Sequence, residues 1–149
     1  MLHIITNPRV YLALQKEIDA ANLSMPSITY AEACDLPYLQ AVIKEGLRIW
    51  PPLASLESKV VPECGDTFKG VYLPGGTHVG LCIWGVMRRS DIWGKDAEIF
   101  RPERWLDTSE DKLKIMESTL DLIFHPGRWG CLGQDMARRQ LNKVLPEVS

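Results

Sequence analysis

The stretch that decides the fold of this chain runs from residue 124 to residue 133 and reads Phe124-His125-Pro126-Gly127-Arg128-Trp129-Gly130-Cys131-Leu132-Gly133. It holds one cysteine, Cys131, with a glycine directly before it and another two residues after it. Glycine adopts backbone conformations that other residues avoid, so the stretch predicts a tight loop. Because the thiolate is the metal-binding form of cysteine, the loop predicts a thiolate that faces a large, flat ligand.

The residues after Cys131 have the spacing of a helix with one buried face. The apolar positions of that face are Leu132, Met136, Ala137, Leu141, Val144 and Leu145. Cys131 is therefore expected at the helix N-terminus, which lowers the pKa of a thiol, and Pro146 is expected to end the helix. Phe124 is expected to pack against the sulfur and exclude water. From the loop alone, a buried free cysteine and a ligand of haem iron are equally good interpretations.

Two charged motifs lie outside the loop. The segment Leu36–Trp50 has the spacing of a mostly apolar helix, and it carries Glu45 and Arg48 on one face. A charged pair on so apolar a helix is expected to be partly buried and to need further hydrogen bonds. Arg104, in the run Phe100-Arg101-Pro102-Glu103-Arg104-Trp105, offers a second guanidinium for the same carboxylate. The sequence thus predicts a Glu–Arg–Arg network.

The three motifs, in this order, resemble the C-terminal part of a cytochrome P-450. They comprise Glu-x-x-Arg at 45–48, Pro-Glu-Arg-aromatic at 102–105 and Phe-x-x-Gly-x-x-x-Cys-x-Gly at 124–133. The resemblance extends from Asn7 to Val148. It implies a mainly α fold with a small β-sheet (α+β), in which residues 1–149 are a partial domain. The family's long central helix, with its acid–alcohol pair for proton delivery, has no counterpart here.

The resemblance implies a role for each matched residue. Cys131 is the expected proximal thiolate ligand of haem iron and the expected metal ligand. Glu45, Arg48 and Arg104 are expected to form a structural network, and no catalytic group beyond the haem ligand is expected. The other residues expected to contact the cofactor are Phe124, Gly127, Gly133, Arg128, Trp129 and Lys59.

Two of these positions depart from the family pattern. Trp129 stands where the family usually has an arginine or histidine that reaches a haem propionate, and Arg128 directly precedes it. An indole N–H donates one hydrogen bond but carries no charge, so Arg128 is the candidate substitute. Lys59 falls where the family usually has an arginine, and it retains the positive charge without the planar fork.

The cofactor that the resemblance implies is haem b, iron protoporphyrin IX. The implied reaction inserts one oxygen atom of O2 into a small organic substrate, with electrons from NAD(P)H through a flavoprotein reductase. A microsomal parent would sit in the endoplasmic reticulum membrane through an N-terminal anchor, which this sequence lacks. Two alternatives stay open: a haem-binding module without oxygenase activity, and a non-functional fragment with exposed apolar faces on helices 8–21 and 36–50 that promote aggregation.

Charge and cysteine usage exclude other classes of protein. A formal net charge of -2 over 149 residues gives no support for nucleic-acid binding. The four cysteines have no Cys-x-x-Cys spacing, so a zinc site is not predicted. The sequence shows no signal peptide, so disulfide bonds are not predicted either. Three of them are expected to be inert thiols: Cys34, Cys64 and Cys82.

Several cations lie near the cysteine in sequence, namely Arg128, Arg138, Arg139 and Lys143. They form either a docking face for an acidic electron-donor flavoprotein or an ordinary solvated helix face. Arg88 and Arg89 are expected to be plain surface charges.

The remaining elements follow from periodicity and turn residues. Helices are expected at Pro8–Ala21, Leu81–Arg89 and Lys112–Leu120, a single turn at Ser27–Ala33, and strands at 59–61, 71–73 and 77–79. The loop Leu53–Leu56 is expected, by the resemblance, to line part of a substrate pocket. Ser90–Ser109 is expected to be irregular and held by Arg104.

Overall fold

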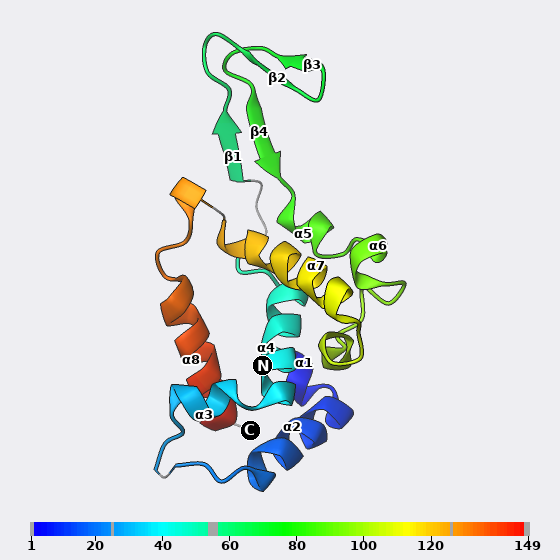
Figure 1. The fold of residues 1–149 in the computed structure, drawn as a ribbon, viewed down its shortest axis with the longest axis vertical. Helices are drawn as coiled ribbons and strands as arrows, with labels where there is room; N and C mark the ends of the chain where they lie inside the picture. Colours follow the sequence, from blue (N-terminus) through cyan, green and yellow to red (C-terminus); the bar gives the residue numbers. More distant parts are fainter. Residues whose placement is uncertain (1, 25, 54–56, 126, 148–149) are drawn as a thin grey trace.

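A helical body carries a long β arm in the computed structural model, which describes residues 2–24, 26–53, 57–125 and 127–147 (Figure 1). The helices are α1 (Leu2–Ile5), α2 (Pro8–Ala20), α3 (Tyr30–Cys34), α4 (Pro37–Ile49), α5 (Ile83–Val86), α6 (Ser90–Trp93), α7 (Glu110–Leu120) and α8 (Gln134–Glu147). The 3-10 turns are η1 (Pro102–Trp105), η2 (Asp121–Phe124) and η3 (Gly127–Trp129). The strands are β1 (Glu57–Val60), β2 (Asp66–Phe68), β3 (Val71–Leu73) and β4 (His78–Leu81). The expected mainly α fold with a small β part is confirmed.

The two helices with the clearest sequence signals begin and end close to where they were expected. Both α2 and α4 start at a proline, which is favourable in the first turn because the missing N–H has no helical partner there. The Asn7 side chain caps α2 by accepting from the Val10 N–H. Glu17 of α2 accepts hydrogen bonds from the N–H groups of Tyr38 (2.7 Å) and Leu39 (2.8 Å). This carboxylate caps α4 from a neighbouring helix and so fixes α2 against it.

The segment expected to be a single turn forms the short helix α3. Thr29 and Glu32 make a capping box, in which each side chain bonds the other residue's backbone N–H. Hydrogen bonds donated by Ser24 and Thr29 lower the pKa of the Glu32 carboxyl to about 2. The Thr-x-x-Glu pattern was the sequence signal for this helix, and it was missed.

The β arm consists of two antiparallel strand pairs. β1 pairs with β4, with Lys59 opposite Val79, and β2 pairs with β3. Strands were expected near β1, β3 and β4, but β2 was missed because its short polar run has no apolar alternation. Residues of β2 and β4 are exposed throughout, so the arm contributes little to the core.

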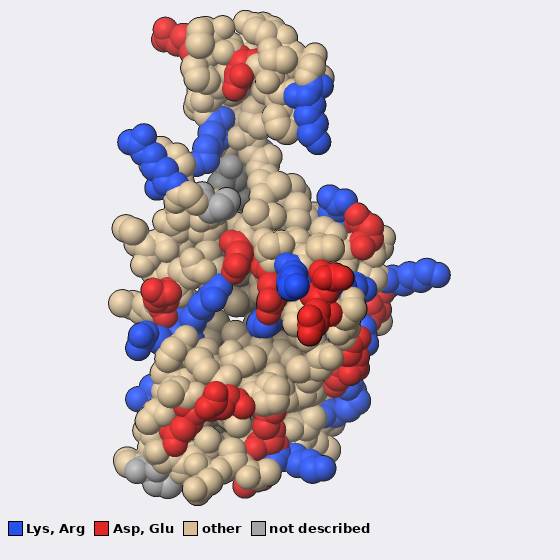
Figure 2. Space-filling model, in the orientation of Figure 1, with Lys and Arg blue, Asp and Glu red and all other residues tan. Residues whose placement is uncertain are grey.

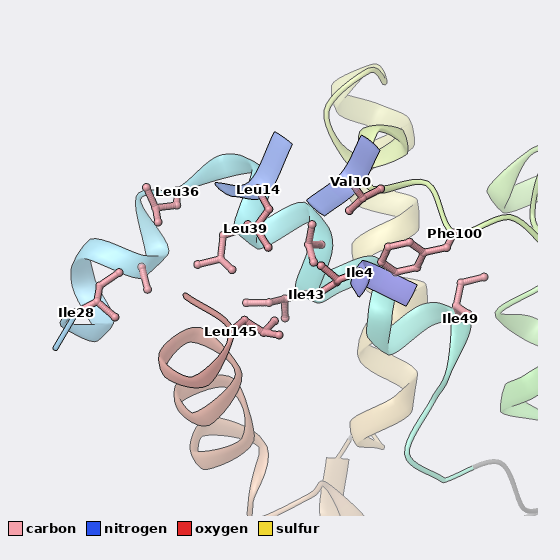
Figure 3. Close-up of a cluster of buried hydrophobic side chains, with 12 residues drawn as sticks. Ile4, Val10, Leu14, Ile28, Leu36, Leu39, Ile43, Ile49, Phe100 and Leu145 are labelled. Atoms are coloured by element: carbon pink, nitrogen blue, oxygen red, sulfur yellow. The ribbon is translucent and has the colours of Figure 1, made fainter. Parts of the chain in front are cut away.

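Helix α4 is buried on two sides and joins two apolar clusters. One cluster contains side chains of α2, α3 and α4, together with Leu145 of α8 and Phe100, which lies between α6 and η1. In Figure 3, Leu145 points toward Ile43, and Phe100 lies beside Ile4. The second cluster packs Ala41 of α4 against side chains of α5, α6, η1, α7 and η2. Because α4 serves both clusters, its polar residues Glu45 and Arg48 are fully enclosed.

Several expectations about local structure were wrong. The helix expected at Leu81–Arg89 covers only Ile83–Val86, since Leu81 continues β4. The stretch Ser90–Ser109 is not wholly irregular, because it contains α6 and η1. Of the pocket loop expected at Leu53–Leu56, residues 54–56 lie outside the described residues.

The helix after the cysteine differs from its prediction in both ends and in burial. It begins at Gln134, three residues after Cys131, and it includes Pro146 in its last turn. Proline has no N–H to donate to the carbonyl four residues earlier, so the helix lacks one hydrogen bond in this turn. The expected buried stripe is only partly buried: Leu145 is enclosed, whereas Leu132, Met136 and Val144 are exposed.

The apolar faces of α2 and α4 are also less exposed than was expected. Val10, Leu14 and Leu39 are completely buried, although Leu12 and Trp50 remain exposed. An apolar cavity of about 480 Å³ remains between α1, α4 and α8. Within the part of the chain that is described, no helix has the length and apolar character needed to cross a bilayer.

Candidate functional site

The Glu45 carboxylate lies at the centre of a buried charged network. It receives two hydrogen bonds from Arg48, Nε to Oε2 at 2.9 Å and Nη2 to Oε1 at 2.8 Å. Arg104 Nε donates to Oε1 at 3.0 Å. All three side chains are at least 98% buried. The structure therefore brings together the three residues from which the sequence predicted a network, with one guanidinium bound bidentately.

Two further donors complete the shell around this carboxylate. The Arg101 backbone N–H donates to Oε1 at 2.9 Å, and the Trp105 indole N–H donates to Oε2 at 3.0 Å. Both residues belong to the Arg-Pro-Glu-Arg-Trp run, and their part in the network was missed. The sequence signal was present, because a buried indole N–H needs an acceptor.

The outer faces of the two guanidinium groups bind backbone carbonyls. Arg48 Nη1 donates to Met87 O at 2.8 Å and Ala97 O at 2.6 Å. Arg104 donates to three carbonyls, those of Trp93 (2.6 Å), Asp96 (2.9 Å) and Ile99 (3.0 Å). Carbonyls at the end of a short helix and in turns need hydrogen-bond donors from outside a regular helix or sheet. The network thus holds the connection between α5 and η1 in place.

Asp96 extends the network toward the surface. Its Oδ1 accepts from Arg104 Nη1 at 3.1 Å, and its Oδ2 lies 2.6 Å from Arg101 Nε. Burial acts to raise the pKa of the Asp96 carboxyl, but the hydrogen bond and charge of Arg104, together with the charge of Arg101, hold that pKa below its ordinary value of 3.8.

Replacing Asp96 with asparagine is expected to reduce the free energy of unfolding by about 1–2 kcal/mol at neutral pH. The folded-state pKa is depressed, so the stabilisation is complete above pH 3.8 and is lost as the pH falls through the lower folded-state value. Urea unfolding at neutral pH and at about pH 3 should therefore show the difference shrinking in acid. Asp107→Asn, at an exposed side chain, is the control, and an equal loss in both variants would refute the role of the ion pair.

Arg88 is not a plain surface charge, contrary to expectation. Its side chain is only 13% exposed, and its Nη2 donates to the Ile49 carbonyl at 2.8 Å. The guanidinium stacks 3.4 Å from the centre of the Trp84 ring, which meets Trp50 edge-on at 5.3 Å. Arg88 therefore satisfies a carbonyl at the C-terminus of α4, where a cation is favourable.

The cysteine loop is shaped by backbone hydrogen bonds and glycines. The Cys131 N–H donates to the Phe124 carbonyl at 2.7 Å, and the Gly130 N–H donates to the Gly127 carbonyl at 2.9 Å. Gly127 has a positive φ of 76°, which side chains disfavour. A Cβ at Gly130 would lie 3.1 Å from the His125 carbonyl oxygen. Both glycines are therefore needed for this loop conformation.

The Cys131 side chain is exposed, and two expectations about it were wrong. Cys131 precedes the first residue of α8 by three positions, and it is Gly133 that accepts from the Ala137 N–H in the first turn. Phe124 belongs to the buried core and joins Cys131 through the backbone hydrogen bond, so it does not shield the thiol from solvent in this structure. The thiol projects from a loop that leads into the helix.

Three of the residues expected to contact the cofactor lie together beside the loop. Lys59 of β1 places its Nζ 4.8 Å from the centre of the Trp129 ring, and the Arg128 guanidinium carbon lies 5.5 Å from the same centre. Trp129 is 66% exposed. The arm and the cysteine loop thus meet around one indole, with a cation from each.

The four cations near the cysteine do not form a single uncompensated patch. Arg138 pairs with Asp121 at 2.7 Å, and Arg139 lies over the Tyr30 ring at 4.9 Å. On the face drawn in Figure 2, basic and acidic side chains are interspersed over the helical body. The other cysteines are exposed free thiols, and the described residues contain no cluster of three or more His, Cys, Asp or Glu that could hold a metal ion.

Comparison with known proteins defines the family. The cytochrome P-450 family pattern matches residues 1–148. A cytochrome P-450 monooxygenase ABA1 of Pyricularia oryzae is 43% identical over 152 residues, covering 99% of this chain and 30% of that protein. The cytochrome P-450 monooxygenase abl1 of Leptosphaeria maculans is 42% identical and is covered to 26%, and pisatin demethylase of Fusarium vanettenii is 35% identical and covered to 28%.

This chain therefore belongs to the cytochrome P-450 family. It spans about 30% of the length of the curated relatives that it matches.

Proposed function

We propose that this chain carries the haem-ligand part of a haem-thiolate monooxygenase, with Cys131 as the proximal ligand of the iron. The observation that carries the proposal is an exposed Cys131 thiol on a glycine-shaped loop, in a chain of the P-450 family. The carbon monoxide difference spectrum of the reduced, haemin-reconstituted chain tests it, because a thiolate ligand shifts the Soret band to the red.

The residues around the thiol fit haem b in their chemistry. A sulfur donor suits iron in this cofactor. Exposed Trp129 and Leu132, on either side of Cys131 in the loop, offer apolar surface to a flat ring. Lys59 and Arg128 offer positive charge for the two propionate carboxylates. One loop and one strand therefore supply a ligand, an apolar face and charge.

Haem supplies the activation of molecular oxygen when it is bound, and the residues of this chain supply its ligand and its binding contacts. The Cys131 thiolate would hold the iron and would supply it with electron density, which is what a thiolate ligand contributes in haem proteins. Lys59, Arg128 and the Trp129 indole N–H would hold the propionate carboxylates of the cofactor. The Gly127 turn presents the sulfur, and the Glu45 network holds the surrounding backbone rather than contacting reacting atoms.

The substrate class and partners proposed for the whole protein are a small organic molecule and a flavoprotein reductase that draws electrons from NAD(P)H. Attachment to the endoplasmic reticulum is proposed only for a microsomal parent. Support comes from relatives named as cytochrome P-450 monooxygenases and from one relative named as a pisatin demethylase. The alternative of a haem-binding module without oxygenase activity is supported by the chain's spanning only about 30% of the length of its relatives. Substrate turnover together with the spectrum separates the two.

Replacing Lys59 with glutamine is expected to weaken haemin affinity about tenfold, which corresponds to about 1.4 kcal/mol. The reason is the loss of one cation beside Trp129, where a carboxylate is proposed to bind. Haemin titration followed by absorbance measures the change. Lys69→Gln is the matched control, since Lys69 lies on the same arm with its Nζ 5.7 Å from the Phe68 ring centre. Equal weakening in both variants would count against a specific role for Lys59.

A further inference from the structure

An ion pair spans the base of the cysteine loop. Arg138 of α8 places Nη2 2.7 Å from Oδ1 of Asp121 in η2, across a separation of 17 residues. The same guanidinium lies 5.5 Å from the centre of the Phe124 ring. Phe124 is the residue whose carbonyl accepts the Cys131 N–H. One side chain therefore joins the segment that leads into the loop to the helix that leaves it.

The helix that carries Arg138 is itself fixed to α4. The Asn142 side chain, which is 4% exposed, donates to the Arg138 carbonyl at 2.9 Å. Its Oδ1 accepts from Gln40 of α4 at 2.6 Å. The backbone at Arg138 is thus a fixed point, from which the side chain reaches Asp121 and Phe124.

The ion pair itself lies at the surface, with side-chain exposures of 44% for Arg138 and 59% for Asp121. Exposed pairs contribute little to global stability. Loss of this ion pair should therefore act locally and weaken the hydrogen bond between the Cys131 N–H and the Phe124 carbonyl. The next residue, Arg139, provides an internal comparison, because it has the same charge on the same helix but lies over Tyr30.

We propose that Arg138, through Asp121 and Phe124, is a positioning residue that holds the Cys131 loop closed at its base. This inference rests on the proposed role of Cys131 as the haem ligand. Arg138 itself is not assigned any contact with the cofactor. Its part is to fix the angle at which the loop leaves η2, and hence the direction in which the thiol projects.

Amide hydrogen exchange in the 149-residue chain tests this role of Arg138 without any cofactor. In Arg138→Gln, the Cys131 N–H is expected to exchange about tenfold faster, from the combined loss of a surface ion pair and a cation–π contact. In Arg139→Gln its rate should stay unchanged. The N–H of Val42, which is a buried residue in the middle of α4, reports global opening and should keep its rate in both variants. Equal Cys131 rates in the two variants would overturn the proposal.

A charge-swapped double variant, Asp121→Arg with Arg138→Asp, guards against simple misfolding. It should restore only the part of the slow exchange that the ion pair provides, because an aspartate at position 138 cannot replace the cation–π contact with Phe124. Exchange as fast as in Arg138→Gln, together with slow exchange in Asp121→Asn alone, would refute the role of the pair. After haemin reconstitution, Arg138→Gln should show a smaller fraction of the thiolate-type Soret band than Arg139→Gln. If Cys131→Ala keeps that band, Cys131 is not the haem ligand. The hydrogen-exchange result still decides whether Arg138 positions the loop.

Discussion

Replacement of Glu45 with alanine is expected to reduce the free energy of unfolding by about 3–5 kcal/mol, the largest loss predicted for any single change in this chain. The carboxylate accepts five hydrogen bonds, which come from Arg48 (two), Arg104, the Arg101 N–H and the Trp105 indole. Among the described residues, its removal leaves the Arg48 guanidinium buried without a counter-charge and leaves Arg104 with only Asp96 as an acidic partner. Since domains of this size are stable by only about 5–15 kcal/mol, much of the total is at stake.

Urea unfolding at neutral pH measures the loss, and Glu117→Ala is the matched control. Glu117 also pairs with a cation, Lys44, at 2.5 Å, but its side chain is 42% exposed. Its removal is expected to cost less than about 1 kcal/mol. If the two variants lost the same stability, the buried network would not be a principal support of the fold.

Glu45→Gln separates charge from packing, because it keeps the volume of the side chain. Both carboxylate oxygens accept hydrogen bonds, and the amide nitrogen of glutamine cannot accept any. One side of the network would therefore face donor against donor. Most of the loss seen with alanine should remain, whereas recovery of wild-type stability would show that shape rather than charge matters at this position.

The sequence predicted both ends of helices α2 and α4 to within one residue, since each has a clear apolar period and α2 also starts at a proline. Burial around Cys131 was less predictable. Periodicity reports which residues share a face, not what covers that face, and so Leu132 and Met136 were expected to be buried but are exposed. The start of α8 was placed too early for a related reason, because no local capping signal fixed it.

In the Glu45 network too, contacts within one helix could be predicted from the sequence, whereas contacts with distant backbone groups could not. Glu45 and Arg48 share a helix face by spacing alone, and Arg104 could be paired with them by charge. The carbonyls of Met87, Ala97 and Ile99 that bind the guanidinium groups could not be predicted, because backbone acceptors leave no mark in side-chain identity. Arg88 was misjudged similarly, since its acceptor is the end of another helix.

Replacement of Cys131 with alanine is expected to abolish the thiolate-type band of the reduced carbon monoxide complex, although the fold should persist. The side chain is exposed and makes no contribution to the apolar clusters, so the free energy of unfolding should change by no more than about 0.5 kcal/mol.

Cys34→Ala is the matched control, because Cys34 is likewise an exposed free thiol on the helical body. It should retain the band at full intensity after haemin reconstitution. Cys131→His separates loss of the ligand from loss of the cofactor, since imidazole also binds haem iron and should give a spectrum of a different type. A thiolate-type band that survives in Cys131→Ala but disappears in Cys34→Ala would assign the ligand to α3 and refute the role of the loop. Loss confined to Cys131→Ala and Cys131→His would assign the thiolate to the loop.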